Sequence, residues 1–323
     1  MEGYEAIKES KQKEVMQTRE PAPQGVEVTN SGTDDIKITR VRITSPVGEQ
    51  SIGKPMGNYI TLEVPRLREN NEPLQEDVSR RFAEELARVL KLGDKSTILV
   101  VGLGNWNVTP DSLGPKVVSK LMVTRHIMDH IPKQINNSVR PVCAIAPGVL
   151  GITGIETGEI VRGVVDKIKP ELVIAIDALA SRKMDRVNST LQIADTGISP
   201  GSGVGNKRME LSIKTLGVPV IAIGVPTVVD AVTLTNDAVE LVLNSIIQSA
   251  QNQNELKKAV ENINRNDSYD IIKKMLNPYS NNLMVTPKEV DEVVEKIANI
   301  IANGINIALH KGVTMNDVNR YIH

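Results

Sequence analysis

Short apolar runs, rich in β-branched side chains, recur through the middle of the chain. These runs fall at residues 98–101, 141–146, 172–176, 190–194 and 219–223. Continuous apolar runs of this length are typical of strands that are covered on both faces. Helical spacing of apolar residues separates the runs at 115–131 and 158–168. This alternation predicts an α/β fold with a mostly parallel central sheet, flanked by helices and joined by right-handed crossovers.

The N-terminal part alternates polar and apolar residues instead. Residues 36–43 alternate most regularly, and turn-forming residues interrupt the pattern on both sides. The stretch 25–63 therefore predicts a small antiparallel β unit. Residues 72–92 then show helical spacing, and Gly93 suits the end of that helix.

The C-terminal part is polar before it becomes helical. Residues 237–248 predict a helix, whereas residues 251–282 are rich in asparagine and show no clear pattern. Residues 286–289 form a capping box with proline at the first helical position, which predicts a helix start. Apolar residues at helical spacing follow, namely Val290, Val293, Val294, Ile297, Ile300 and Ile301. This stripe should pack against the sheet or against a neighbouring subunit.

These patterns divide the chain into an N-terminal arm and one α/β domain. The arm spans residues 1–24; it is charged and compatible with a helix, and two prolines end it. The domain spans the remainder of the chain, residues 25–323. Its expected parts are a β unit at 25–64, a catalytic core at 96–250, a polar connection at 251–282 and a C-terminal helix at 283–310.

The turn after the first buried strand is the main candidate for chemistry. Gly102 and Gly104 allow a sharp turn, and a threonine followed by proline predicts a helix start just beyond. Asp111 therefore lies past the carboxyl end of a strand, which is the edge where ligands bind in open α/β sheets. Asp177 ends the apolar run at 172–176 in the same way. The spacing predicts a pair of carboxyl groups at one edge.

Two carboxyl groups that share a site can hold one proton between them, so that one acts as a base on water and the other as an acid. Asp111 should lie near the first turn of a helix, where free N–H groups favour the ionised form. Asp177 leaves an apolar strand, where desolvation disfavours charge. The sequence thus predicts Asp111 as the base and Asp177 as the acid.

Weaker motifs each lack a part that their chemistry needs. The partial dinucleotide fingerprint after the first strand has Asn107 at its third glycine position. The glycine-rich loop at 199–208 lacks the spacing of a nucleotide P-loop. His126 and His130 are one helical turn apart, but Asp129 replaces the glutamate of a zinc peptidase and no third ligand is evident. Neither a metal nor a cofactor is expected.

Composition narrows the possible functions further. The 323 residues are 40% hydrophobic and 24% charged, with a formal net charge of −1 and no isolated basic block, which indicates neither nucleic-acid nor membrane binding. The single cysteine, Cys143, forms no internal disulfide, which fits a reducing cytoplasm. No apolar run has the roughly 20 residues of a membrane span, and the N-terminus has no apolar signal segment. Ser202 and Cys143 lack the flanking residues of the usual catalytic nucleophiles.

Five motifs, taken together and in order, resemble the spore germination protease family. They lie at residues 108–115, 147–157, 175–180, 200–208 and 226–231, and the resemblance runs from about Gly25 to His310. It implies an atypical aspartic endopeptidase that begins the degradation of small acid-soluble spore proteins in the spore core. It also implies a homotetramer and a phosphorylase/hydrolase-like core similar to that of hydrogenase-maturation peptidases. The family's two essential aspartates fall on Asp111 and Asp177.

Further loop residues are expected at the same edge. Asn105, Glu156 and Lys207 are possible active-site loop residues, and each is equally suited to hydrogen bonding within its own loop. Members of the family are typically made as zymogens, whereas residues 1–6 here are similar to the mature start. The sequence therefore predicts no self-processing step that switches activity on.

Two other classes of function remain open. A metal-dependent hydrolase or maturation peptidase would use Asp111 and Asp177 as ligands, and sensitivity to chelators distinguishes it from an aspartate pair. A non-enzymatic binding module would tolerate conservative changes at both aspartates. For assembly, the stripe on the last helix and the β unit before Glu63 are predicted to be buried between subunits.

Overall fold

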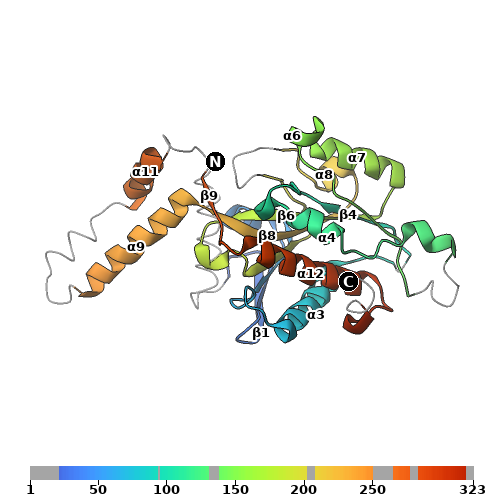
Figure 1. Cartoon of the computed structure of the whole chain (residues 1–323), viewed down its shortest axis with the longest axis horizontal. Helices are drawn as coiled ribbons and strands as arrows, with labels where there is room; N and C mark the ends of the chain where they lie inside the picture. Colours follow the sequence, from blue (N-terminus) through green and yellow to red (C-terminus); the bar gives the residue numbers. More distant parts are fainter. Residues whose placement is uncertain are drawn as a thin grey trace.

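The computed structural model describes residues 22–93, 95–130, 138–201, 208–249, 265–276 and 283–317. Within these residues nine strands form one continuous sheet in the order β1-β2-β3-β7-β8-β6-β4-β5, with β9 (Met284–Val285) paired to β8. Helices cover both faces of this sheet (Figure 1): α3, α4 and α12 pack on one face, and α7 and α8 pack on the other.

Four strands form the parallel half of the sheet. They are β5 (Val142–Ile145), β4 (Ile98–Gly102), β6 (Leu172–Ser181) and β8 (Val220–Asp230). Their pairings are all parallel. Every residue of β4 is buried, as its continuous apolar run predicted. The strands β6 and β8 continue several residues beyond their apolar runs.

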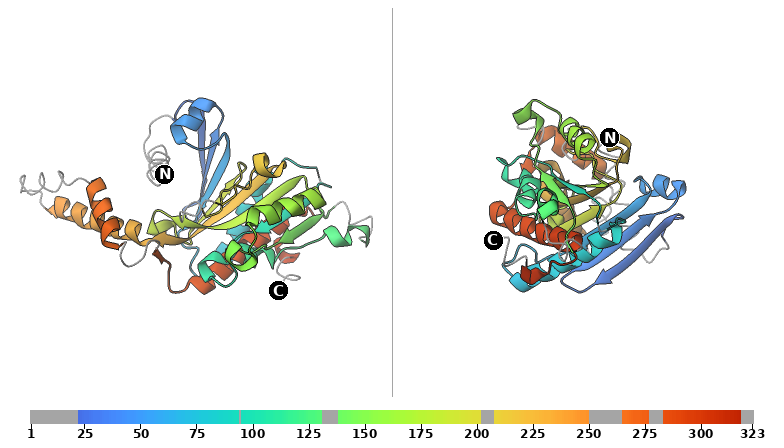
Figure 2. Two further views of the ribbon diagram at one scale, coloured as in Figure 1. Left: turned by 90° about the horizontal axis from the view of Figure 1, so that it is seen from above. Right: turned by 90° about the vertical axis from the view of Figure 1, so that its right-hand side faces the viewer.

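The other half of the sheet is antiparallel. The strands β1 (Val26–Gly32), β2 (Lys37–Ile43) and β3 (Gly57–Glu63) pair as the alternating pattern predicted. In addition β3 pairs with β7 (Thr190–Ala194), which pairs with β8, so the N-terminal β unit is continuous with the core sheet. In Figure 2 the strands β1 to β3, in blue, extend away from the rest of the molecule.

The prediction of a mostly parallel sheet holds for four strands and is wrong for the sheet as a whole, where antiparallel pairings are more numerous. The connection from β6 to β7 explains the difference. It contains one short 3-10 helix, η3 (Met184–Arg186). A parallel return would need a crossover of a dozen or more residues, so the short connection brings β7 back in the opposite direction.

The helices and 3-10 turns lie between these strands. Their bounds are α2 (Pro46–Ile52), α3 (Glu72–Val89), η1 (Thr109–Asp111), α4 (Leu113–Val118), η2 (Arg125–His130), α6 (Leu150–Thr153), α7 (Thr157–Ile168), α8 (Ile213–Leu216), α9 (Ala231–Ser249), α11 (Arg265–Leu276) and α12 (Val290–Leu309). The predicted helices at 72–92 and 158–168 are confirmed as α3 and α7. The end of α3 is capped at Leu90, before Gly93.

The predicted helix at 115–131 is wrong, because α4 ends at Val118. Contacts from distant parts of the chain stop it. The main-chain N–H of Met122 donates to Asn306 Oδ1 of α12 at 2.9 Å, and that of Thr124 donates to the carbonyl of Val142 in β5 at 2.9 Å. These bonds take the place of the intrahelical ones, so the chain leaves the helix.

The long helix α12 closes the core. All six residues of its predicted apolar stripe are buried in the cluster beneath the sheet. Gly304 lies so close to the ring of Phe82 in α3 that a side chain there would overlap it. The stripe therefore packs against the chain's own sheet and α3, and is not free to form a subunit interface.

The start of α12 differs from the predicted capping box. Thr286 Oγ1 donates to the carbonyl of Thr227 at 2.9 Å instead of capping the helix. The residue at the N-cap is Glu289, and its side chain makes no capping bond. The threonine thus fixes the segment before α12 to the end of β8.

Two helices extend away from the sheet in Figure 1, α9 and α11, which contact each other. The first begins earlier than the predicted 237–248, and its side chains of Leu241 and Val242 are 71% and 59% exposed. The second falls within the polar connection, where no helix was predicted. The rest of that connection, and the N-terminal arm up to residue 21, lie outside the described residues. None of the helices in the described ranges has the length and apolar character needed to cross a bilayer.

Candidate active site

Close backbone contacts hold the loop that carries Asp111. At its ends, Gly102 of β4 lies against the carbonyl of Gly114 in α4, with no space for a Cβ at either position. Inside the loop, Gly104 has a φ of +114° and lies against the carbonyl oxygen of Asp111. The N–H of Asn105 donates to Asp111 Oδ2 at 2.8 Å. Glycine thus lets the chain fold back on itself and fixes this carboxyl beside the end of β4.

Asp177 lies in β6, one residue past the last pair that β6 makes with β4, Gly102 with Ile176. It is 5% exposed, and 3-10 helix η1 packs against both β6 and β8. Its neighbour Ala178 packs into the core on the α12 side. Because side chains alternate along a strand, Asp177 points to the face covered by α7 and α8.

The two carboxyl groups influence each other's proton affinity. Burial raises the pKa of Asp177 to about 7; the negative charge of Asp111 adds to the rise, and the main-chain N–H of Ala178 and the charge of Arg208 oppose it. Burial also raises the pKa of Asp111, against the N–H of Asn105 and the charge of Arg208. The structure therefore brings Asp111 and Asp177 together at the carboxyl ends of β4 and β6.

Asp111 lies just before the first turn of helix α4, as the sequence predicted, but its pKa is raised and not lowered. It is the last residue of η1, and the N–H group that binds its carboxylate comes from Asn105, within the loop. The groups that favour its ionised form are this hydrogen bond and the nearby charge of Arg208. Burial raises its pKa rather than leaving it at the ordinary value.

Arg208 is a site residue that sequence reasoning did not single out. The next residue, Met209, donates its N–H to Glu156 Oε1 at 3.3 Å, and its side chain packs on Gly158, where a Cβ would overlap it. Glu156, at the start of α7, thus holds the segment that brings the guanidinium charge near both aspartates. The only signal in the sequence was its place at the end of the glycine-rich motif at 200–208.

The three predicted loop residues Asn105, Glu156 and Lys207 differ in their positions and contacts. The Oδ1 atom of Asn105 accepts the N–H of Asn107 at 3.0 Å, so this side chain stabilises its own loop. Glu156 supports the segment of Arg208, as described above. Lys207 lies outside the described residues.

No three side chains of histidine, cysteine, aspartate or glutamate gather as a possible metal site within the ranges that the structure describes. His126 and His130, for which no metal-binding role is expected, lie in η2.

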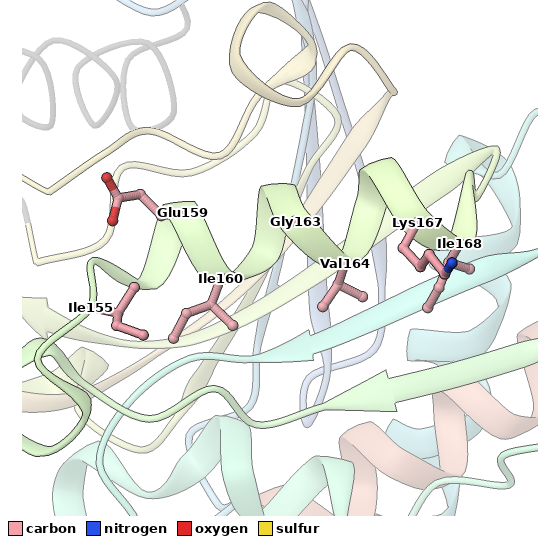
Figure 3. A pocket seen from close by; sticks show the side chains of 7 residues that line it. All are labelled: Ile155, Glu159, Ile160, Gly163, Val164, Lys167 and Ile168. Atoms are coloured by element: carbon pink, nitrogen blue, oxygen red, sulfur yellow. The ribbon is translucent and has the colours of Figure 1, made fainter.

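A surface depression of about 560 Å³ runs along the outer side of α7 and contains neither aspartate (Figure 3). Its lining is mainly apolar, with one charge toward each end. The lining residues are Ile155, Glu159, Ile160, Gly163, Val164, Lys167 and Ile168.

Known proteins are similar to this chain over nearly its whole length. The sequence profile of the family described as germination protease matches residues 1–266 and 249–322. The germination protease of Clostridium acetobutylicum is 52% identical over 302 residues, which cover 93% of this chain and 92% of that protein. That of Clostridium tetani is 51% identical over 93% of each chain. That of Halalkalibacterium halodurans is 41% identical over 100% of this chain and 95% of its own.

Proposed function

The chain belongs to the germination protease family and is thus a peptidase, and from this premise we propose that it is an endopeptidase that uses Asp111 and Asp177 as an atypical pair. One observation carries the proposal: Asp177 is buried, and the charge of Asp111 helps to raise its pKa to about 7. Two coupled carboxyl groups with different proton affinities are what acid and base catalysis by one pair requires.

In this mechanism Asp111 is ionised and Asp177 carries the shared proton. Asp111 removes a proton from a water molecule, and the water oxygen attacks the carbonyl carbon of the scissile peptide. Asp177 gives its proton to the carbonyl oxygen, which yields a neutral tetrahedral intermediate. Collapse of this intermediate breaks the C–N bond, and the proton held by Asp111 passes to the leaving nitrogen. As the carbonyl re-forms, one hydroxyl group of the intermediate returns its proton to Asp177, so that the pair again holds one shared proton.

Arg208 has a supporting role in this scheme. Burial alone would tend to protonate both carboxyl groups, and a nearby positive charge opposes this. Arg208 lowers the pKa of both groups. Its charge therefore keeps one member of the pair ionised.

We propose small acid-soluble spore proteins as the substrate and the spore core as the place of action, on the strength of the five ordered motifs. The parallel half of the sheet, with the pair at the ends of β4 and β6, supports a phosphorylase/hydrolase-like core similar to that of hydrogenase-maturation peptidases. A homotetramer is the proposed assembly. Because the stripe of α12 is buried in the chain itself, the exposed Leu241 and Val242 of α9 are better candidates for subunit contacts.

The test is to incubate the purified chain with a small acid-soluble spore protein and to identify the fragments by mass spectrometry. Cleavage at a few sites is expected, while a folded, unrelated protein stays intact. Asp111→Asn and Asp177→Asn should each lose nearly all activity, and Asp166→Asn, an exposed residue of α7, should keep it. Intact substrate after prolonged incubation would contradict the proposal. Loss of activity on chelation, restored by a divalent metal, would favour the metal-dependent alternative.

A further inference from the structure

The strand β6 loses one of its two neighbouring strands, β4, just before Asp177. Up to Ile176 it pairs with β4 on one side and with β8 on the other. On the β4 side, the N–H of Leu103 still donates to the carbonyl of Ile176 at 2.8 Å, although Leu103 lies beyond β4. From there β6 continues to Ser181 with β8 alone. In the part of the chain that the structure describes, no strand pairs with residues 178–181 on the β4 side.

Residues 178–181 therefore form a short open edge. Ala178, Leu179 and Ala180 are partly exposed, in contrast to the fully buried residues before them. Main-chain groups two residues apart in a strand point to the same side. Those of Ala178 thus point where the carbonyl of Ile176 points, into the space that β4 leaves when it turns at Gly102. An edge of this kind can accept an added strand from another chain.

The aspartate pair lies at the start of this open edge. Asp177 is the residue just before it, and its carboxyl group lies close enough to the main chain of Ala178 for that N–H to lower its pKa. Leu179 shares a face with Asp177 and packs over Gly224 of β8. A strand added here would place its main chain, the part that a peptidase cuts, directly beside the carboxyl group.

We propose that the substrate binds as an extended strand added to the open edge of β6 at residues 178–181, which aligns the scissile peptide bond with the aspartate pair. The proposal rests on the endopeptidase function proposed above and deepens it. Main-chain hydrogen bonds supply the affinity in such a complex, so an unfolded or extended segment is required. A folded protein, whose main chain is already paired, cannot enter.

The test uses a synthetic peptide that spans a cleavage site mapped with the wild-type enzyme. One N-methyl group at a time replaces a main-chain N–H along the peptide. Alternate positions should lose about tenfold in kcat/KM, the effect of one main-chain hydrogen bond, while the positions between them change little. This two-residue period is the signature of an added strand, and the intervening positions are the matched controls. Equal effects at neighbouring positions would overturn the proposal. Failure to cleave the unmodified peptide would instead count against the endopeptidase function.

A second measurement does not depend on turnover. Amide hydrogen exchange is recorded for the Asp111→Asn variant with and without a saturating concentration of the unmodified peptide, with binding followed by a fluorophore on the peptide. The segment that contains residues 178–181 should exchange more slowly in the complex, while β1 is unchanged. Saturated binding with no protection of 178–181 would overturn the proposal.

Discussion

Gly102, the last residue of β4, and Gly114, in the first turn of α4, are in direct backbone contact with no room for a side chain between them. This contact closes the loop that carries Asp111. The position of the carboxyl group therefore depends on two residues that take no part in chemistry.

Gly102→Ala should lower the free energy of unfolding by about 1–3 kcal/mol, because the new methyl group must displace the backbone of α4. It should also lower kcat/KM more than stability alone explains, since the loop with Asp111 moves. Gly163→Ala in α7 is the matched control: its Cβ meets open space, and alanine should stabilise the helix by up to about 1 kcal/mol. Chemical denaturation and kinetics measure both effects. A Gly102→Ala variant as stable and active as wild type would contradict this account.

The aspartate pair should give a bell-shaped dependence of kcat/KM on pH, because Asp111 must be ionised and Asp177 protonated. The alkaline limb should lie near pH 7, where the pKa of Asp177 falls. Both limbs belong to the coupled pair rather than to single residues. Activity that stays constant up to pH 9 would exclude Asp177 as the acid.

The raised pKa of Asp177 also predicts how the stability of the fold depends on pH. Its pKa is raised from 3.8 in the unfolded chain to about 7 in the folded one, so the folded state holds the proton more tightly. Stability should therefore fall as the pH rises from about 4 to about 7, where the buried group becomes charged. Asp177→Asn should be more stable than wild type at pH 8, by about 1–4 kcal/mol, and should lose this advantage toward pH 4. Thermal unfolding at both pH values decides the matter.

Arg208→Gln should raise the pKa of both carboxyl groups and move the whole pH profile to higher pH, because a positive charge near both is removed. Arg208→Lys keeps the charge and should leave the profile close to that of wild type. Arg80→Gln, at an exposed position of α3, is the control for the loss of an arginine. A lower rate at every pH, with no shift of either limb, would show that Arg208 is structural only.

His310, 1% exposed at the end of α12, should make the fold sensitive to mild acid. Burial lowers its pKa from 6.5 to about 4, and the charge of Arg140 contributes, against the main chain of Met122. Below about pH 6.5 the unfolded chain binds a proton that the folded chain does not, so stability should fall as the pH decreases toward 4. The total effect is about 3 kcal/mol.

The variant His310→Gln isolates this contribution. It should be less stable than wild type at pH 7.5, since His310 Nδ1 accepts the N–H of Arg140. The stability difference between the two proteins should then shrink at pH 5. If the difference is the same at both pH values, His310 does not titrate on unfolding.

Local patterns predicted the elements whose environment is uniform. The run at β4, the spacing of α7 and the stripe of α12 were all identified correctly. Burial on one side gives a periodic pattern of apolar residues in the sequence, and burial on both sides gives a continuous apolar run. The proximity of Asp111 and Asp177 was predicted for a related reason: each follows such a run, and parallel strands end at one edge of the sheet. Their catalytic role stays a proposal.

Contacts between distant residues could not be predicted in this way. The end of α4 depends on Asn306, far along the chain in α12, which binds the N–H of Met122. The approach of Arg208 to the aspartates depends on the bond from Met209 to Glu156. Asn306 and Glu156 are residue types that are common at protein surfaces. The sequence therefore gives no sign of these two contacts, which depend on the fold.

The packing of α12 on α3 also determines when the core can fold during synthesis on the ribosome. Phe82 of α3 packs against Gly304 of α12, so this part of the core cannot form until residue 304 has been synthesised. Until β7 emerges, the edge of β3 that pairs Tyr59 with Ala194 has no partner. The nascent chain therefore exposes an open strand edge until β7 has emerged and an unfinished core until α12 has emerged. In such a state aggregation competes with folding, and chaperones act on it.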